Sequence, residues 1–400
     1  MNATPALGAT ESAALPSGWR WAQLGELGTY INGRAFKPDD WGTSGLPIIR
    51  IQNLNTPDAP SDRYEGLVDD GHLIADGDLL ISWSASLDAY IWDGGPAALN
   101  QHIFKVVVNQ DLVTRDYLFY AVKYAMTGIR KRVHGATMQH VTKPEFVATR
   151  IPLPPLPDQQ RIVAALRGQL NAAARMRAAA EAQAIAGAQL AVAAHRTEFA
   201  GMPIHELPLA EHAIFLPARS TTTTGDALVP VATSGCLSPS AFNPSGVVTN
   251  RMWSSDLEAA RLRQGEVLVA RSNTAELVGQ SAMYDGHPEE VYAADLTIRL
   301  WPRPEVDARY LAHSLTFVWS TGYWRERAVG ASWTMKKLSR RLLGQVAIPV
   351  PSLEEQRLVV RRLDDRLRRS AAMNRSVTEQ AAEIGRLPEA LLRCAFLAPR

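Results

Sequence analysis

The chain has 400 residues, of which 46% are hydrophobic and 20% charged, and its formal net charge is +2. This length allows two or three domains with ample core, and the small net charge by itself favours no class of partner. Two cysteines leave neither a disulfide framework nor a four-ligand zinc site, and no run of 18 apolar residues is present to span a bilayer, so we expect a cytoplasmic protein without membrane contact.

The first globular unit is expected over residues 15–155. Before it, residues 1–14 are rich in alanine, threonine and serine and lack the basic start of a signal peptide, which predicts a disordered tail. Within the unit, a helix would place Leu118, Val122 and Ile129 on one side. The expected elements are three β-type runs and this helix, in the order 46–51, 76–82, 102–108 and 117–133.

The stretch Ile151–Leu170 ends this unit and recurs as Ile348–Leu367, at a constant offset of 197 residues. In both copies, a proline-bounded extended run leads into a helix start with acidic residues and a glutamine, Gln159 or Gln356. Because this offset is nearly half the chain, the repeat indicates two related units in tandem.

Each copy continues as a helical pattern, which predicts a central long helix over 156–200 and a C-terminal long helix over 353–397. About 40 residues correspond to roughly 60 Å of helix, and a helix of that length with one narrow apolar seam needs a partner helix. We expect the two helices to pair with each other. The pairing residues are Ile162, Leu166, Leu170, Val359, Leu363 and Leu367. The same seam continues through Ala173, Met176 and Leu190 in the first helix and through Met373, Val377, Ile384, Leu387 and Leu391 in the second.

Residues 201–352 repeat the order of elements of the first unit. Gly265–Ala270 matches Gly77–Ser82, and Arg271–Thr274 stands in the position of Trp83–Ser86. The intervening loops differ in length and chemistry, which fits a scaffold with two specificities and equally fits ordinary divergence after duplication. The fold class is α/β in the mixed, α+β sense, with two tandem domains separated and followed by long helices in a pseudo-two-fold repeat.

No catalytic constellation is visible in the sequence. It lacks a phosphate-binding loop, the His-Glu-x-x-His and Cys-x-x-Cys motifs, and any acidic residue two positions before a lysine, which is a common metal-nuclease signature. Asn243-Pro244 continues to serine and glycine, without the aromatic residue that an amino-methyltransferase uses against a flipped base. His134 and His140 have no third metal ligand nearby in the sequence. We therefore expect no catalytic residue and no metal site.

Two variable units that each end in Pro-x-Pro-x-Leu-x-[Asp/Glu]-Gln at a helix start resemble the DNA specificity subunits of type I restriction–modification systems. The motif stands here at Pro152–Gln159 and Pro349–Gln356. The resemblance covers essentially residues 15–397. It extends to the start of that family's first target-recognition domain through three further stretches, Leu15–Gly25, Ile48–Asn53 and Gly77–Ser82.

This resemblance implies a DNA-binding subunit in which each globular unit is a target-recognition domain that reads one half of a split target. The two long helices would pack as an antiparallel coiled coil that acts as a spacer, and two methyltransferase subunits would dock on them. Those subunits, together with restriction and translocase subunits, would carry out adenine methylation or restriction. S-adenosylmethionine, ATP and magnesium would bind to the partners, and this chain would carry no cofactor.

Polar side chains beside the predicted strands are the candidates for contact with double-stranded DNA. Base edges are read by arginine, lysine, asparagine, glutamine, serine and threonine, and phosphates by arginine and lysine. Each single residue fits a solvated or turn-forming group equally well. In the first unit the candidates are Arg34, Lys37, Arg50, Gln52, Asn53, Ser82, Trp83, Ser84, Gln101, His102, Thr137 and Gln139. In the second unit they are Arg219, Thr222, Thr223, Arg271, Ser272, Asn273, Thr274, Thr334, Lys336 and Lys337.

Two other classes of protein remain open at this stage. An enzyme, such as a fused methyltransferase–recognition protein, would bind S-adenosylmethionine through this chain itself. A coiled-coil adaptor, or a specificity protein that works without its complex, would be encoded away from methyltransferase and translocase genes.

Overall fold

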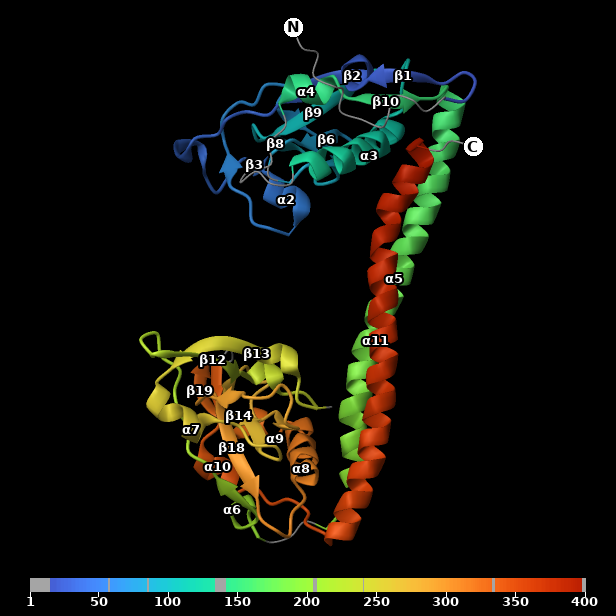
Figure 1. The fold of residues 1–400 in the computed structure, drawn as a ribbon. Helices are drawn as coiled ribbons and strands as arrows, with labels where there is room; N and C mark the ends of the chain where they lie inside the picture. Colours follow the sequence, from blue (N-terminus) through green and yellow to red (C-terminus); the bar gives the residue numbers. More distant parts are fainter. Residues whose placement is uncertain are drawn as a thin grey trace. The chain divides into compact units, whose positions relative to one another are not determined.

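The computed structural model describes residues 15–56, 58–84, 86–133, 142–203, 207–239, 241–332 and 335–397. The chain forms two compact units (Figure 1). The first unit comprises Met1–Ala178 and Ala381–Arg400, and the second comprises Ala179–Gln380. Each unit therefore contains one globular part and a segment of both long helices, whereas the domain bounds expected from the sequence kept the helices separate. The expected tail, 1–14, lies outside the described residues.

Antiparallel pairing dominates the strands of the first unit. These strands are β1 (Arg20–Gln23), β2 (Gly28–Asn32), β3 (Leu46–Ile49), β4 (Arg63–Tyr64), β5 (Leu73–Ile74), β6 (Leu79–Ser82), β7 (Asp88–Ile91), β8 (Ala97–Leu99), β9 (Ile103–Val108) and β10 (Arg150–Leu153). The central sheet has the order β2-β9-β6-β7 and is antiparallel throughout. A second sheet has the order β4-β3-β8-β5, in which β3 and β8 are parallel, and β1 pairs with β10.

Helix α3 (Arg115–Val133) packs its apolar side against the central sheet (Figure 1). Leu118, Val122 and Ile129 are fully buried in one core with Ile81 of β6 and Phe104 of β9. The helical spacing in the sequence therefore predicted the inner side of this helix correctly. The short helices of the unit are α1 (Leu24–Leu27), α2 (Ile51–Asn55), α4 (Lys143–Val147) and the 3-10 turn η1 (Pro38–Asp40).

The second unit repeats this arrangement. Its strands are β11 (Ala213–Phe215), β12 (Ala227–Ala232), β13 (Val247–Met252), β14 (Val267–Ala270), β15 (Ser272–Asn273), β16 (Ser281–Met283), β17 (Tyr292–Ala293), β18 (Thr297–Pro302), β19 (Val329–Ser332) and β20 (Met335–Lys337). The sheet β11-β18-β14-β16 is antiparallel, like its counterpart in the first unit. The sheet β13-β12-β17 again contains one parallel pair, β12 with β17, and β15-β20-β19 forms a third sheet.

Helix α8 (Ala308–Ser320) takes the place that α3 has in the first unit, with Leu311 and Leu315 fully buried against Val267 and Val269 of β14. The same packing solution thus recurs on a second sheet of the same strand order. The remaining helices are α6 (Leu209–His212), α7 (Leu257–Ala260), α9 (Tyr323–Arg327) and α10 (Arg340–Gly344), with the 3-10 turns η2 (Ser234–Cys236), η3 (Pro244–Gly246) and η4 (Ser254–Asp256).

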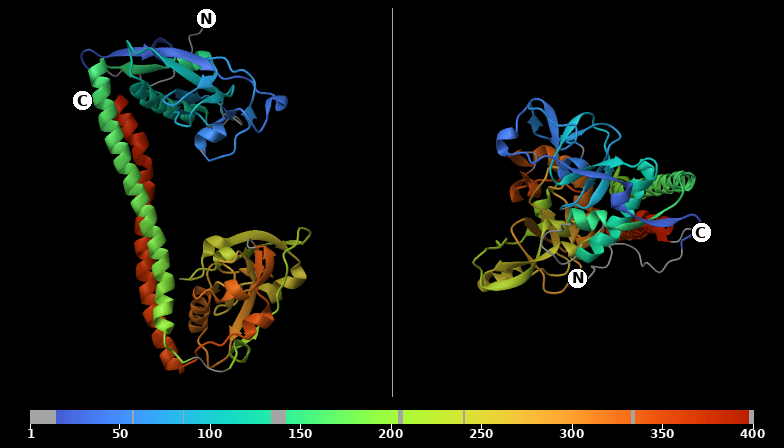
Figure 2. Two further views of the ribbon diagram at one scale, coloured as in Figure 1. Left: turned by 180° about the vertical axis from the view of Figure 1, so that it is seen from behind. Right: turned by 90° about the horizontal axis from the view of Figure 1, so that it is seen from above.

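Two long helices, α5 (Leu156–Phe199) and α11 (Leu353–Leu397), run side by side (Figures 1 and 2). In the first unit the start of α5 meets the end of α11, because Leu166 shares a core with Leu392 and Phe396. In the second unit the end of α5 meets the start of α11, where Phe199 packs with Leu363. The pairing is therefore antiparallel within each unit, as the resemblance implied.

Only part of the apolar seam that the sequence predicted between α5 and α11 is buried. Leu166, Val359, Leu363 and Leu367 are buried, and Ile162 and Leu170 are half-buried. In the expected continuation Ala173 and Val377 are buried, and Ile384 and Leu391 are half-buried. The continuation is wrong for four residues, since Met176, Leu190, Met373 and Leu387 are exposed. A pair of helices buries only a narrow stripe on each partner, and a straight helix drifts out of a seven-residue repeat.

Small residues take over the contact in the second unit. Ala180 and Ala191 of α5 are buried, and Ser370 Oγ of α11 donates a hydrogen bond to Gly187 O at 3.0 Å. A Cβ atom on Gly187 would lie 1.8 Å from Asn374 Oδ1. The alanine-rich stretch of α5 therefore serves, at least in part, to let α11 approach closely.

The repeated glutamines fix the helix starts to their domains. Gln159 is fully buried, and its Oε1 accepts a hydrogen bond from Thr114 N at 2.8 Å. Its Nε2 donates to Leu112 O and Pro154 O, both at 2.9 Å. One amide side chain thus satisfies three backbone groups that would otherwise be buried without partners.

Gln356 makes the same three bonds in the second unit. Its Oε1 accepts from Asp307 N at 2.8 Å, and its Nε2 donates to Glu305 O and Pro351 O at 2.9 and 2.8 Å. The sequence repeat therefore preserves a hydrogen-bond arrangement as well as a helix start.

A buried tyrosine completes this repeated frame in each unit. Tyr117 Oη donates to Pro152 O at 2.7 Å, and Tyr310 Oη donates to Pro349 O at 3.0 Å. Both rings are fully buried. Proline carbonyls at equivalent positions are thus tied to the helix that covers each central sheet.

Candidate nucleic-acid interface

Two arginines of the first unit are held against aromatic rings near the β3–β4 edge. The Arg34 guanidinium lies 4.4 Å from the centre of the Tyr64 ring, and the Arg50 guanidinium lies 4.7 Å from that of Trp41. Arg50 also forms an ion pair with Asp62 at 2.6 Å. Because a ring or a carboxylate fixes the plane of a guanidinium, these two groups are prepared for contact with a planar acceptor.

The remaining candidates at this edge differ in exposure. Lys37 and Gln52 are exposed. Asn53 is buried, its Oδ1 accepts from Arg50 N at 3.0 Å, and its Nδ2 donates to Ala59 O at 3.1 Å. The Asn53 amide therefore closes the turn after β3 and is not available for contact with DNA.

Ser82 is also not available for contact with DNA. Its side chain is fully buried at the end of β6, where Asp88 N donates to Oγ at 3.0 Å and the hydroxyl donates to Ser86 O. The hydroxyl supports the loop between β6 and β7. Sequence reasoning identified a polar residue at the end of a strand but had no means of knowing that neighbouring backbone groups use its hydroxyl.

The Trp83 ring contacts both the core residue Phe104 and the exposed candidate His102. Its ring stacks on Phe104 with centres 5.8 Å apart, and lies 5.5 Å from the ring of His102. Gln101 and His102 are exposed, with Gln101 Nε2 3.3 Å from His102 Nε2, and Ser84 is half-buried. Trp83 is therefore partly a core residue, while Gln101 and His102 are presented to solvent.

Five candidates of the second unit come together on the sheet β15-β20-β19. Ser272 lies opposite Lys337 and Asn273 lies opposite Lys336 in the β15–β20 register. Arg271 immediately precedes β15 and is exposed. Strand pairing thus gathers three cationic and two neutral polar side chains from distant parts of the sequence.

Three further candidates lie beside β13. Arg219 forms an ion pair with Asp256 at 2.8 Å, Thr222 N donates to Arg251 O at 3.0 Å, and Thr223 is exposed. Sequence reasoning missed Arg251 itself, although the polar residues within the β-type run 247–252 could have indicated an exposed strand.

The other candidates of this set serve a turn or lie outside the described residues. Thr274 is half-buried, and its carbonyl oxygen accepts from Leu277 N and Val278 N at 3.2 and 3.0 Å. Its place in the turn makes it a weaker candidate. Those outside the described part of the chain are Thr137, Gln139 and Thr334.

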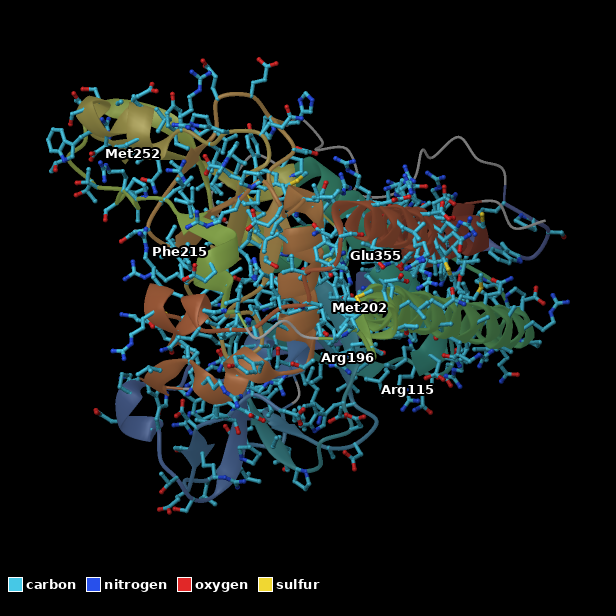
Figure 3. The ribbon with its side chains drawn as sticks, turned by 90° about the horizontal axis from the view of Figure 1, so that it is seen from below. Arg115, Arg196, Met202, Phe215, Met252 and Glu355 are labelled. Carbon is cyan, nitrogen blue, oxygen red and sulfur yellow. The ribbon has the colours of Figure 1, made fainter. Side chains whose placement is uncertain are left out.

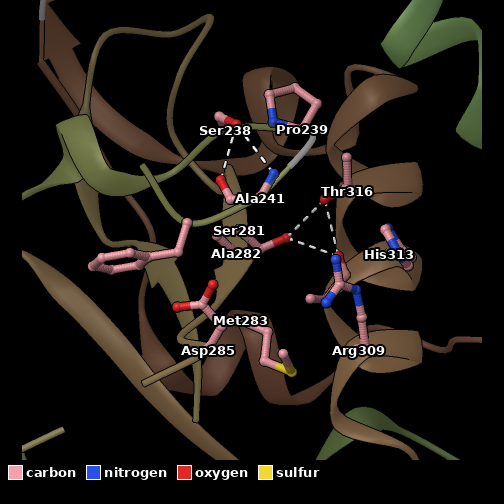
Figure 4. Close-up of a pocket in the computed structure, with 12 residues that line it drawn as sticks. Ser238, Pro239, Ala241, Ser281, Ala282, Met283, Asp285, Arg309, His313 and Thr316 are labelled. Carbon is pink, nitrogen blue, oxygen red and sulfur yellow. Dashed lines mark hydrogen bonds between the residues drawn. The ribbon is translucent and has the colours of Figure 1, made fainter. Parts of the chain in front are cut away.

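A small cavity of about 30 Å³ opens in the second unit beside β16 and α8 (Figure 4). On its wall Ser281 Oγ donates to Ala312 O at 3.1 Å and lies 3.2 Å from Thr316 Oγ1. Such a volume holds about one water molecule. The cavity is too small for a nucleotide or for S-adenosylmethionine.

Within the described ranges, no three or more histidine, cysteine, aspartate or glutamate side chains gather in a way that would hold a metal ion. None of the helices in these ranges is long and apolar enough to cross a bilayer.

A series of buried polar contacts connects α8 with α5 and α11 in the second unit. His195 Nδ1 donates to Ala191 O at 2.8 Å, so Nε2 of the neutral ring accepts from His313 Nδ1 at 3.0 Å. His313 Nε2 lies 3.3 Å from Asp364 Oδ1. Burial, aided by nearby His313, lowers the pKa of His195 to about 4. Burial by itself raises the pKa of Asp364, but the hydrogen bond from His313 and the charge of Arg309 outweigh it and lower the value.

Known proteins resemble this chain in both sequence and fold. Residues 16–173 match the family model of the type I restriction modification DNA specificity domain. The chain is 27% identical over 146 residues to the type I restriction enzyme EcoBI specificity subunit of Escherichia coli, which covers 36% of this chain and 31% of that relative. It is 25% identical over 150 residues to the MjaVIII specificity subunit of Methanocaldococcus jannaschii, covering 37% and 35% of the two chains. The matches thus span about a third of each curated relative.

Solved structures match over nearly the whole chain. One of them comes from work on the structural basis of complex assembly and conformational transition of the type I R-M system. It has a TM-score of 0.70 at 19% sequence identity, and the match covers 96% of this chain and 99% of that chain. The HsdS subunit from Thermoanaerobacter tengcongensis has a TM-score of 0.53 at 20% identity, with 97% and 99% covered.

The fold of this chain, mixed helix–strand units with long antiparallel helices, is thus that of these solved structures, one of which is an HsdS subunit. Residues 16–173 resemble the type I restriction modification DNA specificity domain, and the curated proteins similar to this chain are specificity subunits of type I restriction enzymes.

Proposed function

We propose that this chain is the sequence-specific, non-catalytic DNA-binding subunit of a type I restriction–modification complex. Each unit reads one half of a bipartite target in double-stranded DNA. The chain directs adenine methylation or restriction that partner subunits carry out, and its cytoplasmic location follows from that role.

One observation carries this proposal. The family model matches only 16–173, yet the second unit repeats the strand order of the first central sheet and the three hydrogen bonds of its buried glutamine. A second reading domain on the same frame supports a two-part target, since protein geometry sets half-site spacing in paired DNA readers.

Cationic side chains of both units suit contact with DNA. Arg34 and Arg50 are oriented by aromatic rings, and Arg271, Lys336 and Lys337 are gathered on one small sheet. Arginine is a bidentate partner of guanine, and arginine and lysine neutralise phosphates. These groups provide both sequence reading and general affinity.

The helix pair is the expected docking place for two methyltransferase subunits. In the second unit an apolar groove of about 950 Å³ runs along α5 and α11, and exposed Ile185 lies on its wall. Leu190 and Met373 line a neighbouring groove and are also exposed. Exposed apolar side chains clustered on paired helices favour a protein partner. S-adenosylmethionine, ATP and magnesium would be held by the methyltransferase, restriction and translocase subunits.

A map of modified bases in the host genome tests the proposal. We expect methylated adenines in one interrupted, asymmetric motif when this gene and its methyltransferase partner are present. Deletion of this gene should abolish the methylation, and re-expression of the wild-type chain should restore it. Absence of any gene-dependent motif would refute the proposal, and binding of S-adenosylmethionine by the isolated chain would favour the enzyme alternative.

A further inference from the structure

Strand β13 of the second unit is exposed on both of its faces. Its side chains from Val248 to Arg251 are exposed in succession, with Val248 44% exposed. Successive side chains of a strand point to opposite faces, so four exposed neighbours mean that neither face of β13 itself is covered at these positions. On β12, Val229 and Val231, which lie opposite Asn250 and Val248, are buried. An ordinary edge strand on a core would alternate between buried and exposed positions.

The corresponding edge of the first unit is much shorter. There β3 pairs in parallel with β8 and carries β4 on its other side, just as β12 pairs in parallel with β17 and carries β13. However, β4 has only two residues, whereas β13 has six. The extension of this edge strand therefore belongs to the part that differs between two otherwise similar units.

The exposed ribbon of β12 and β13 has a firm base. Met252, labelled in Figure 3, is fully buried and packs with Val229 and Val231 of β12. Beyond it, Ser254 N and Oγ donate to the two carboxylate oxygens of Asp226, each at 2.7 Å. Because both strands are fixed where they meet the unit, the exposed residues are presented in a defined register.

The side chains on this ribbon match base-edge chemistry. Thr249 and Arg251 lie on one face of β13, together with exposed Leu228, which lies opposite Arg251 on β12. Asn250 lies on the other face, and its Oδ1 accepts a hydrogen bond from Arg251 N at 2.8 Å. Arginine pairs with guanine, and apolar groups contact the thymine methyl group. Within the described residues, Arg251 has no carboxylate partner, and one of its N–H groups donates to Gly225 O at 3.0 Å.

We propose that the β12–β13 ribbon enters the major groove of duplex DNA with the face that carries Arg251, and that Arg251 reads a base of the half-site of the second unit. The major groove admits a two-stranded ribbon. The inference rests on the proposed function and names the reading element of one of its two domains. None of the candidates from the sequence lies on this strand.

The test uses the full chain with its methyltransferase partner and maps methylated motifs for Asn250→Ala, Arg251→Ala and Arg251→Lys. We expect Arg251→Ala to lose discrimination by about 5- to 150-fold at one or two positions of one half-site, as for loss of a bidentate base contact. Asn250→Ala, on the opposite face of the strand, should leave the motif unchanged. Arg251→Lys should also relax the motif, because lysine keeps the charge but not the bidentate geometry. Arg50→Ala in the first unit should affect only the other half-site and thereby assign the halves.

Arg303→Ala is the matched control, since Arg303 is an exposed arginine of the same unit that follows β18 and lies away from the ribbon in sequence and sheet order. It should leave the motif unchanged. Hydrogen exchange of β12 should be unaltered in each variant, which separates loss of reading from loss of folding. If the wild-type chain gives a bipartite motif and the Arg251 variants preserve both halves, the ribbon inference is wrong while the proposed function stands. A uniform loss of methylation with an unchanged motif would also overturn it, because it indicates phosphate contact only.

Discussion

A cationic side chain occupies the equivalent position of the central sheet in each unit, but the two side chains are buried to different extents. Lys105 lies opposite Leu80 between β9 and β6, and Arg299 lies opposite Leu268 between β18 and β14. In the first unit Lys105 Nζ lies 3.2 Å from Asp78 Oδ2, and the two side chains are 19% and 27% exposed. The frame therefore requires a cation here but does not dictate its surroundings.

The second unit buries this pair almost completely. The Arg299 and Glu266 side chains are 3% and 0% exposed, and two Arg299 nitrogens donate to the two carboxylate oxygens at 2.8 and 2.9 Å. Arg299 also donates to Ala259 O and Arg261 O, whereas Lys105 donates to Leu73 O. The five donors of a guanidinium reach more partners than an ammonium, which allows deeper burial. Equivalent topology thus tolerates different chemistry provided that every buried polar group has a partner.

The largest expected effect comes from removing the buried cation. Arg299→Met would leave Glu266 buried without its partner, and we expect a loss of about 3–5 kcal/mol from the free energy of unfolding of the second unit. Lys105→Met should cost about 1 kcal/mol or less in the first unit, because Asp78 stays partly hydrated. Hydrogen exchange in β14 and β18, compared with β6 and β9 of the same intact chain, measures the two effects separately.

A double variant, Arg299→Met with Glu266→Met, is the control for this experiment. It should recover most of the lost stability, since replacing both members of a buried pair removes the unpaired charge. Equal losses in the two units for the single variants would contradict the comparison.

The frame was predictable from sequence because it consists of local patterns that occur twice. The helix starts at Gln159 and Gln356, the inner side of α3 and the long helices all follow from spacing and proline positions. The partnership of Lys105 with Asp78 was not visible, since it joins β9 to the residue that immediately precedes β6. Pairings of this kind depend on strand register, which no residue pattern of this single sequence specifies.

The reading surface was less predictable than the frame. Asn53 and Ser82 have the right residue types, but their polar atoms are used by nearby backbone groups. Arg251 escaped notice because a polar strand with two exposed faces lacks the alternation by which strands are recognised. The continuation of the helix seam failed where small residues replace large ones at the contact, as at Gly187.

A second prediction tests whether the repeated glutamines are equivalent. Gln159→Leu and Gln356→Leu each remove three hydrogen bonds to backbone groups and leave these groups buried. We expect a loss of about 2–3 kcal/mol in the unit concerned and little change in the other. Denaturant titration followed by hydrogen exchange measures both values. A loss in only one unit would show that the frame is repeated in sequence but not in energetic role.

The smallest expected effect is a pH dependence confined to the second unit. His195 has a folded pKa of about 4 against an ordinary value of 6.5, so the unfolded chain binds the proton first as pH falls. The stability that this site contributes is therefore complete above pH 6.5 and is lost as the pH falls towards 4, by about 2 kcal/mol at pH 5. Asp364, whose pKa is also lowered, adds an acid loss only below its usual range near 3.8, so the window between pH 6.5 and 5 isolates His195. In this window the exchange rates of β14 and β18 should rise relative to those of β6 and β9, and His195→Gln should remove most of the difference. An unchanged pH response in that variant would assign the effect to another group.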